Sequence, residues 1–192
     1  MRREDAIVEA AARLGARKSY ASISMDEIAE NAGVTKPTVY AYFGSKEQIF
    51  IRVATGAIER FRSALISGQS RRSAFTLLRD LVLHFAIARM SQSGGEAFVL
   101  TEAVEVARSS EYRAAQRALV SCLQDCVVAA QQAGAIRSDV QPESVVLLVL
   151  AFLRGLHPTS LSPNANAKQA ALEAAAILFG GLTGQTRKRG LA

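Results

Sequence analysis

The stretch from Ser24 to Phe50 constrains the fold most, because it carries start and stop signals for short helices in close succession. Ser24, followed three residues later by Glu27, forms a capping box and predicts a helix start. Gly33 predicts the end of that helix, since glycine accepts a positive φ. Thr35 is predicted to cap the next helix. Two short helices joined by a glycine-containing turn describe a helix-turn-helix.

The second of these helices has a composition suited to contact with a polyanion. No acidic residue lies between Asn31 and Lys46. With Val39 and Phe43 predicted to face inward, the outward positions are Lys36, Pro37, Thr38, Tyr40 and Ala41, with Tyr42 at one flank. These groups donate to phosphate oxygens or meet base edges. The alternative is a solvated amphipathic helix whose tyrosines cover the core.

The residues from Ala6 to Phe50 resemble the N-terminal DNA-binding domain of TetR/AcrR-type transcriptional regulators. The resemblance is carried by the motif SMDEIAENAGVTKPTVYAYFGSKEQIF, and its ending T-V-Y-A-Y-F-x-S-K-E is specific to that family. Two residues depart from the pattern: Gly15 replaces a bulky aromatic residue, and Ser19 replaces a glycine. Both concern the first helix and its end, so they bear on local packing rather than on DNA contact.

The resemblance implies roles for individual side chains. Base edges would be contacted by Lys36, Pro37 and Thr38, and phosphates would be bound by Ser24, Thr35, Tyr40, Tyr42 and Lys46. Lys46 lies in the first turn of a following helix, where a phosphate can be bound. Members of this family are most often repressors, dimerise through their last two helices and release DNA when a small molecule binds.

The whole chain is predicted to be all-α, with a three-helix helix-turn-helix domain followed by a helical ligand-binding and dimerisation domain. The first domain covers residues 1–50, and a fourth helix over 45–66, capped by Ser45 with Gln48, connects it to the rest. The second domain covers 67–186, and residues 187–192 form a flexible tail. Further helices are expected at about 4–17, from 75 to about 90, and at 96–107, 110–133, 142–156 and 167–182.

The second domain is expected to enclose a largely apolar effector pocket between its helices. The candidate lining residues are His84, Glu102, Tyr112, Gln116, Leu119 and Leu123.

Two helices of this domain are too apolar for a monomer. Residues 145–153 read VVLLVLAFL, apolar all round, and the last helix is rich in alanine. Together with their copies across a two-fold axis they are predicted to form an isologous interface. The residues assigned to it are Val149, Phe152, Leu153, Leu156, Ala171, Ala175, Leu178 and Phe179. The alternative is that 145–153 is the central core helix of the domain.

Charge and cysteine content give only weak indications of partners and location. The net charge of +6 is a weak indication of a polyanionic partner, because residues 1–52 hold eight basic and seven acidic residues. Cys122 and Cys126, four apart, are interpreted as core residues rather than a thiol sensor or metal ligands. No metal, no cofactor and no membrane span are expected. Two cysteines and an N-terminus without an apolar leader favour the cytoplasm.

The function predicted from these observations is a homodimeric DNA-binding regulator, most simply a repressor released from a palindromic operator by a largely apolar effector. A helical ligand carrier or protein-interaction module that no longer binds DNA is the alternative, favoured only by Gly15 and Ser19. An enzyme is not expected, because the sequence has no phosphate-binding glycine loop, nucleophile motif or recognisable pair of catalytic carboxylates.

Overall fold

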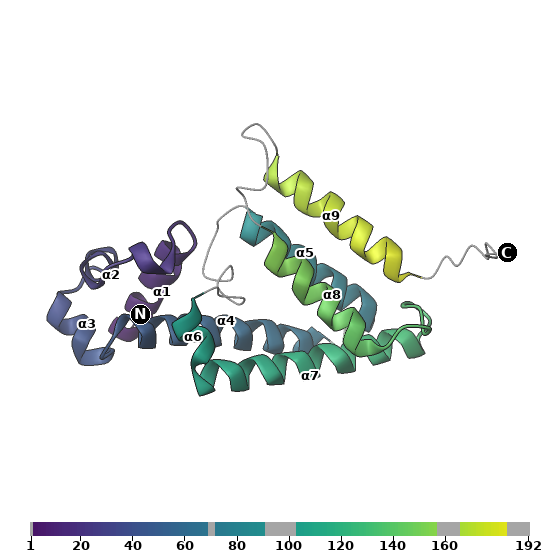
Figure 1. Cartoon of the computed structure of the whole chain (residues 1–192), viewed down its shortest axis with the longest axis horizontal. Helices are drawn as coiled ribbons and strands as arrows, with labels where there is room; N and C mark the ends of the chain where they lie inside the picture. Colours follow the sequence, from purple (N-terminus) through teal and green to yellow (C-terminus); the bar gives the residue numbers. More distant parts are fainter. Residues whose placement is uncertain (1, 69–71, 91–102, 157–165, 184–192) are drawn as a thin grey trace.

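The computed structural model describes residues 2–68, 72–90, 103–156 and 166–183. Its N-terminal part consists of α1 (Arg3–Gly15), a 3-10 turn η1 (Tyr20–Ser22), α2 (Met25–Ala32) and α3 (Lys36–Tyr42). α1 packs against α2 and α4, while α3 packs against α2. These helices form one end of the elongated molecule (Figure 1).

Helix α4 (Lys46–Gly68) joins this end to the remainder without a break. Ile49, Phe50 and Val53 are buried among the N-terminal helices, and Phe61 and Leu65 are buried further along the same helix. Tyr20 packs edge-on against Phe50, with ring centres 5.2 Å apart. One helix therefore supplies side chains to both ends of a continuous apolar core.

The C-terminal part is helical throughout its described residues. It contains α5 (Ala74–Met90), α6 (Val104–Arg108), α7 (Ser110–Gln132), α8 (Pro142–Gly155) and α9 (Ala167–Leu182). The most extensive packing between described elements joins α4 to α7, and α9 packs on α5. Arg89 of α5 donates from Nε to the carbonyl of Leu156 at 2.7 Å, which ties α5 to the end of α8. The backbone N–H of Arg137 donates to the carbonyl of Leu182 at 2.9 Å, which ties the loop after α7 to the end of α9.

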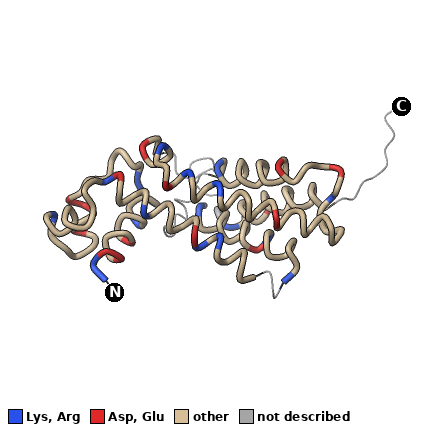
Figure 2. The backbone as a smooth tube through the Cα atoms, turned by 90° about the horizontal axis from the view of Figure 1, so that it is seen from below, with Lys and Arg blue, Asp and Glu red and all other residues tan. Residues whose placement is uncertain are grey.

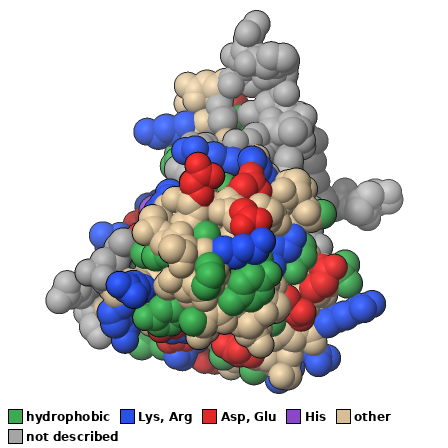
Figure 3. Space-filling view, turned by 90° about the vertical axis from the view of Figure 1, so that its left-hand side faces the viewer, with side chains coloured by type: hydrophobic (Ala, Val, Ile, Leu, Met, Phe, Trp, Pro, Cys, Tyr) green, Lys and Arg blue, Asp and Glu red, His purple; other side chains and the backbone are tan. Residues whose placement is uncertain are grey.

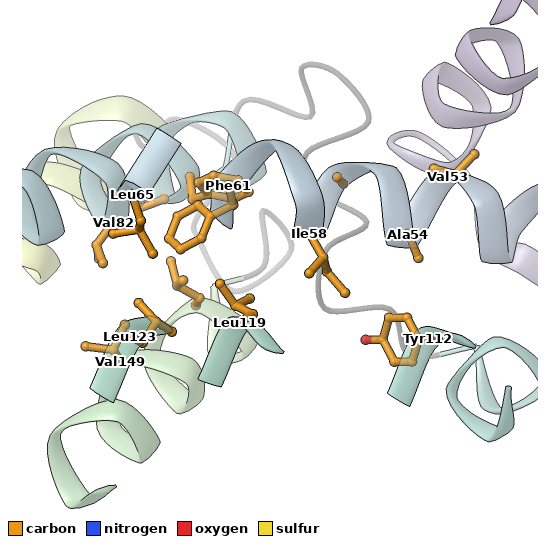
Figure 4. Packing of buried hydrophobic residues seen from close by; sticks show 14 of the residues in the cluster. Val53, Ala54, Ile58, Phe61, Leu65, Val82, Tyr112, Leu119, Leu123 and Val149 are labelled. Atoms are coloured by element: carbon orange, nitrogen blue, oxygen red, sulfur yellow. The ribbon is translucent and has the colours of Figure 1, made fainter. Parts of the chain in front are cut away.

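The core of the C-terminal part lies where α4 and α7 meet. Figure 4 shows Ile58, Phe61 and Leu65 of α4 facing Leu119 and Leu123 of α7. Phe61 also meets Phe85 of α5 edge-on, with ring centres 4.5 Å apart.

The observed elements confirm the predicted all-α class, and no strand occurs in the described ranges. The helix predicted over 167–182 has those bounds, and α7 ends one residue before the predicted 133. The predicted helix over 96–107 lies mostly outside the described residues. The described residues at its end belong to α6. Among the described helices none is both long and apolar enough to cross a bilayer. The predicted tail, 187–192, also lies outside the described residues.

Candidate nucleic-acid interface

The turn between α2 and α3 is fixed by the caps that the sequence indicates. The backbone N–H of Glu27 donates to Ser24 Oγ at 3.1 Å, and the N–H of Ser24 donates to Glu27 Oε2 at 2.9 Å. Gly33 ends α2 with φ of 67°, a left-handed conformation that favours glycine. The N–H of Thr38 donates to Thr35 Oγ1 at 3.4 Å. The predicted capping box and helix-turn-helix are confirmed.

α3 turns one narrow face inward and presents the rest to solvent. Val39 is fully buried and Phe43 is 7% exposed, whereas Tyr40 and Tyr42 are 48% and 50% exposed. Lys36 and its neighbours Pro37 and Ala41 are also exposed, and Thr38 is half-buried. Large aromatic side chains left in water at the tip of a molecule are typical of a binding surface. The outward face of α3 is therefore available for contact along its whole length.

The surface around α3 is mixed in charge rather than uniformly basic. Figure 3 looks onto this end of the molecule and shows basic, acidic and hydrophobic side chains side by side. Figure 2 shows Lys, Arg, Asp and Glu interspersed along the rest of the chain as well. The net charge of +6 is consequently not gathered at α3. Recognition by this face must depend on local donors and shape more than on a strong positive field.

Three polar side chains at the start of α3 already have partners. Lys36 Nζ lies 2.8 Å from Asp26 Oδ2 of α2, and this hydrogen bond raises the pKa of Lys36. The hydroxyls of Thr35 and Thr38 are 2.8 Å apart and share a hydrogen bond. The contact with Asp26 was not predicted, because the acid precedes the turn by several residues and only the fold brings it to α3.

Lys46 has different partners from those predicted. Its ammonium donates to the carbonyls of Tyr20 at 2.9 Å and Ile23 at 2.8 Å, and it lies 4.4 Å from the centre of the Tyr20 ring. Two of its three N–H groups are therefore used inside the domain. The observed role of Lys46 is to tie η1 and the start of α2 to α4, and phosphate binding remains a prediction for the third N–H.

The departures at Gly15 and Ser19 do not disturb this end of the molecule. Gly15 is the last residue of α1, and the carbonyl of Ser19 accepts from Ser22 Oγ at 2.9 Å within the turn of η1. Tyr20 then supplies an aromatic ring to the core beside Phe50. The local packing that these residues put in question is complete.

The predicted effector-pocket residues are brought together only in part. Tyr112, Leu119 and Leu123 are buried on α7, and Figure 4 shows them on its side facing α4. Gln116 Nε2 donates to the Tyr112 hydroxyl at 2.6 Å. His84 is exposed on α5, so its placement in an internal pocket is corrected. Glu102 lies outside the described residues.

A groove of about 540 Å³ runs between α4 and α7. None of the six predicted pocket residues lines it; the lining consists of Arg52, Thr55, Gly56, Glu59, Arg60, Ser63, Glu111 and Ala115. The predicted apolar pocket is therefore not this groove.

The outward orientation expected for the interface residues is wrong for most of them. Within a single chain the following are already buried: Val149, Leu153, Ala171, Ala175, Leu178 and Phe179, while Phe152 and Leu156 are half-buried. The error arises because 145–153 is apolar all round, so the sequence does not distinguish the core face from the outer face. The large apolar side chains that remain exposed on α8 and α9 are Leu147, Leu148 and Ile177, at 69%, 47% and 79%.

Of the two cysteines predicted to lie in the core, Cys126 does so and Cys122 is half-buried against it. Cys126 is fully buried, and its Sγ lies 3.3 Å from the carbonyl of Ala74. Burial raises the pKa of the Cys126 thiol to about 11 and also raises that of Cys122. In the described part of the chain no group of His, Cys, Asp or Glu side chains is arranged to hold a metal ion.

An exposed second helix of a helix-turn-helix, joined by one long helix to an all-α domain, defines a helical transcriptional regulator. The family description "Bacterial regulatory proteins, tetR family" matches residues 7–53, and "Transcriptional regulator SbtR-like, C-terminal domain" matches residues 74–183. The chain belongs to the TetR family of DNA-binding transcriptional regulators.

Individual relatives agree with this assignment over part of the chain. The HTH-type transcriptional regulator EthR of Mycolicibacterium smegmatis is 43% identical over 58 residues, which is 30% of this chain and 27% of that protein. The HTH-type transcriptional activator FasR of the same organism is 29% identical over 90 residues, 43% of this chain and 41% of that protein. The chain thus matches less than half the length of either relative.

Solved structures extend the similarity of fold to nearly the whole chain. AibR, crystallised with isovaleryl coenzyme A and operator DNA, superimposes with a TM-score of 0.72 at 23% identity, covering 93% of this chain and 98% of that one. The fatty acid degradation regulator FadR from Bacillus halodurans also gives 0.72, at 17% identity, covering 95% and 97%. At these identities the similarity shows the fold.

Proposed function

We propose that the protein is a homodimeric repressor that binds a palindromic operator and leaves it when a small, largely apolar effector binds. The observation that carries the proposal is the outward face of α3. Tyr40 and Tyr42 are about half exposed on it, and the opposite face is anchored by the fully buried Val39. A short helix held this firmly can enter the major groove without rearrangement.

The side chains on that face divide into two groups of proposed contacts. Contacts with base edges are proposed for the start of α3, because recognition helices contact bases with their N-terminal residues. The residues concerned are Lys36, Pro37 and Thr38. Contacts with phosphates, which position the helix but carry no sequence information, are proposed for Ser24, Thr35, Tyr40 and Tyr42. Lys46 would add one phosphate contact through its remaining N–H.

The second copy of the chain is proposed to cover the exposed apolar face of α8 and α9. The exposed apolar side chains are Leu147, Leu148 and Ala151 of α8 and Ile177 of α9, and together they are called the α8–α9 face below. Apolar side chains exposed to this degree are characteristic of an interface. A two-fold dimer would place two copies of α3 for successive major grooves of a palindrome.

The effector is proposed to act at the apolar contact between α4 and α7. Tyr112 and Gln116 supply a hydrogen-bonded polar pair there, beside the buried Leu119. Among the proteins of similar fold, AibR was solved with isovaleryl coenzyme A and FadR from Bacillus subtilis with stearoyl-CoA. Their ligands support an acyl-type effector for this chain. A thousandfold loss of DNA affinity requires the effector to favour the released state by about 4 kcal/mol.

Selection of bound fragments from a random duplex pool tests DNA recognition directly. A palindromic consensus is the expected result, and absence of enrichment at low salt would favour the helical carrier over the regulator. With the recovered operator, Thr38→Ala should relax base preference. Tyr40→Phe should instead weaken binding to all sequences alike. If neither variant differs from the unaltered protein, these two roles are wrong.

The effector is sought by mass spectrometry of small molecules retained by the purified protein, followed by operator release with acyl-CoA compounds of short and long chains. If acyl-CoA compounds of one chain-length class release the operator, and Gln116→Leu weakens this release, the effector site between α4 and α7 is supported. If Gln116→Leu leaves the release of the operator unchanged, the effector binds elsewhere. Because these proteins act on chromosomal DNA, we propose a cytoplasmic location.

A further inference from the structure

The start of α3 is held by a carboxylate from the preceding helix. Asp26 Oδ2 lies 2.8 Å from Lys36 Nζ, although the two residues are ten apart in the sequence. Lys36 is the only charged residue of α3. Among the described residues no other carboxylate forms an ion pair with this helix. The single cation that α3 brings to DNA is therefore neutralised while the protein is free.

This ion pair is easily exchanged. The side chains of Lys36 and Asp26 are 48% and 68% exposed, so water and salt screen their attraction. A phosphate oxygen, or the O6 and N7 atoms of guanine, can replace the carboxylate as the acceptor for the ammonium. After such an exchange Asp26 remains next to a polyanion without its counter-charge.

The cost of that exchange differs between DNA sequences. On a duplex without a suitable base edge, the ammonium gains only a phosphate contact, while the exposed carboxylate is repelled by the same backbone. On the operator, contact between Lys36 and a base edge offsets the repulsion. A repulsive element that is offset only at the correct site raises discrimination.

We propose that Asp26 is a specificity-determining residue, whose carboxylate withholds the Lys36 ammonium from phosphates until a base edge replaces it. The inference rests on the proposed DNA-binding function. An acidic residue contributes no attraction to DNA, so Asp26 would not be found by looking for residues that bind phosphates.

The test measures affinity for the operator and for a random duplex, over a range of salt, in the unaltered protein and in Asp26→Asn. Asparagine keeps the shape and removes the charge. We expect the affinity for the random duplex to rise about two- to fivefold at low salt. For the random duplex, the slope of log K against the logarithm of the salt concentration should become steeper by about one unit, since Lys36 becomes free to displace a counterion from a phosphate. Operator affinity should rise less, so the specificity ratio falls.

Three controls separate this role from a general effect of charge or folding. Asp139→Asn removes an exposed ion pair with Arg137 in the C-terminal part and should change neither affinity. Asp26→Glu restores the carboxylate and should restore the salt dependence. In a Lys36→Ala background, Asp26→Asn should give a smaller gain, which reflects only the carboxylate's own repulsion from DNA, because the carboxylate then has no ammonium to withhold.

The outcomes distinguish this inference from the proposed function. If the unaltered protein discriminates no operator, the proposed function fails. If it discriminates normally and Asp26→Asn leaves the salt slope and the specificity ratio unchanged, only the role of Asp26 is overturned. An equal gain on both duplexes, or a gain of undiminished size in the Lys36→Ala background, shows simple repulsion and overturns it as well.

Discussion

The ammonium of Lys46 lies 4.4 Å from the centre of the Tyr20 ring and donates to the carbonyl of the same residue at 2.9 Å. One cation thus binds both the ring and the backbone of Tyr20. It also reaches the carbonyl of Ile23 at 2.8 Å, directly before the cap of α2. The placement of the helix-turn-helix relative to α4 depends on this side chain.

Replacement of Lys46 by methionine should lower the free energy of unfolding by about 1–3 kcal/mol, because two carbonyls lose a charged donor. Urea denaturation measures the change. Lys168→Met is the matched control, since Lys168 is exposed on α9 and should be neutral. A variant of Lys46 that binds DNA weakly yet unfolds at the normal urea concentration would show that phosphate contact, not attachment of η1, is its main role.

Replacement by alanine should change the free energy of unfolding in opposite directions at two glycines. Gly33 has φ of 67°, so Gly33→Ala places an L-residue in the left-handed region and should cost about 1–2 kcal/mol, although its Cβ would meet nothing within 4 Å. Gly56 lies inside α4, and its added Cβ would make an ordinary contact of 3.5 Å with Arg60. Gly56→Ala should therefore stabilise the helix by about 0.5–1 kcal/mol.

Thermal unfolding monitored by circular dichroism measures both changes, with about 2–4 °C expected for each kcal/mol in a chain of this size. A neutral Gly33→Ala would contradict the requirement for a left-handed residue at the turn. A destabilising Gly56→Ala would instead indicate that α4 needs a flexible or closely approached position there.

The raised pKa of Cys126 predicts an inert thiol. With a pKa of about 11 against an ordinary 9.0, only about one thousandth of the Cys126 side chain is thiolate at about pH 8. Alkylation followed by mass spectrometry should leave Cys126 unmodified in the native protein and modify it in guanidinium. Rapid labelling of native Cys126 would contradict its burial in the core.

The same shift makes stability dependent on alkaline pH. The folded state holds the Cys126 proton more tightly than the unfolded state, so the associated stability is present below about pH 9 and is lost as the pH rises toward 11. Cys126→Ala should reduce this alkaline loss, at the cost of a small cavity.

The exposed α8–α9 face should hold the dimer together. Leu148→Glu combined with Ile177→Glu removes two large apolar side chains from each copy and should weaken association at least about a hundredfold. Sedimentation equilibrium measures the dissociation constant. Ile66→Glu is the control, because Ile66 is also a large apolar side chain, 49% exposed, but belongs to α4. Unaltered association in the double variant would place the interface elsewhere.

Much of the N-terminal structure could be predicted because its signals are local. Ser24 with Glu27, Gly33 and Thr35 fix helix ends through contacts between residues three or four apart, and each was found where the sequence indicates. The contacts of Lys36 with Asp26 and of Lys46 with Tyr20 are not local, since the first depends on how α3 meets α2 and the second on how α4 meets η1. Such partners cannot be read from spacing along the chain.

The burial of the residues assigned to the interface was missed for a related reason. Val149 and Leu148 are neighbours of the same apolar character, yet one is 1% and the other 47% exposed. Periodicity distinguishes the faces of a helix only when polar residues mark one of them, and residues 145–153 have none. His84 was misplaced similarly, because its apolar neighbours suggested an interior that lies on the other side of α5.

Phe50 and Phe61 stand on one unbroken helix, yet Phe50 packs on Tyr20 near the DNA-binding end and Phe61 packs on Phe85 in the C-terminal part. Each residue of an α-helix is rotated by about 100° from the one before it. Inserting or deleting a single residue between these two rings would therefore turn one of them out of its core. A chimera that joins this N-terminal domain to the body of a relative within α4 must preserve the register of that helix, because no loop interrupts it between Phe50 and Phe61.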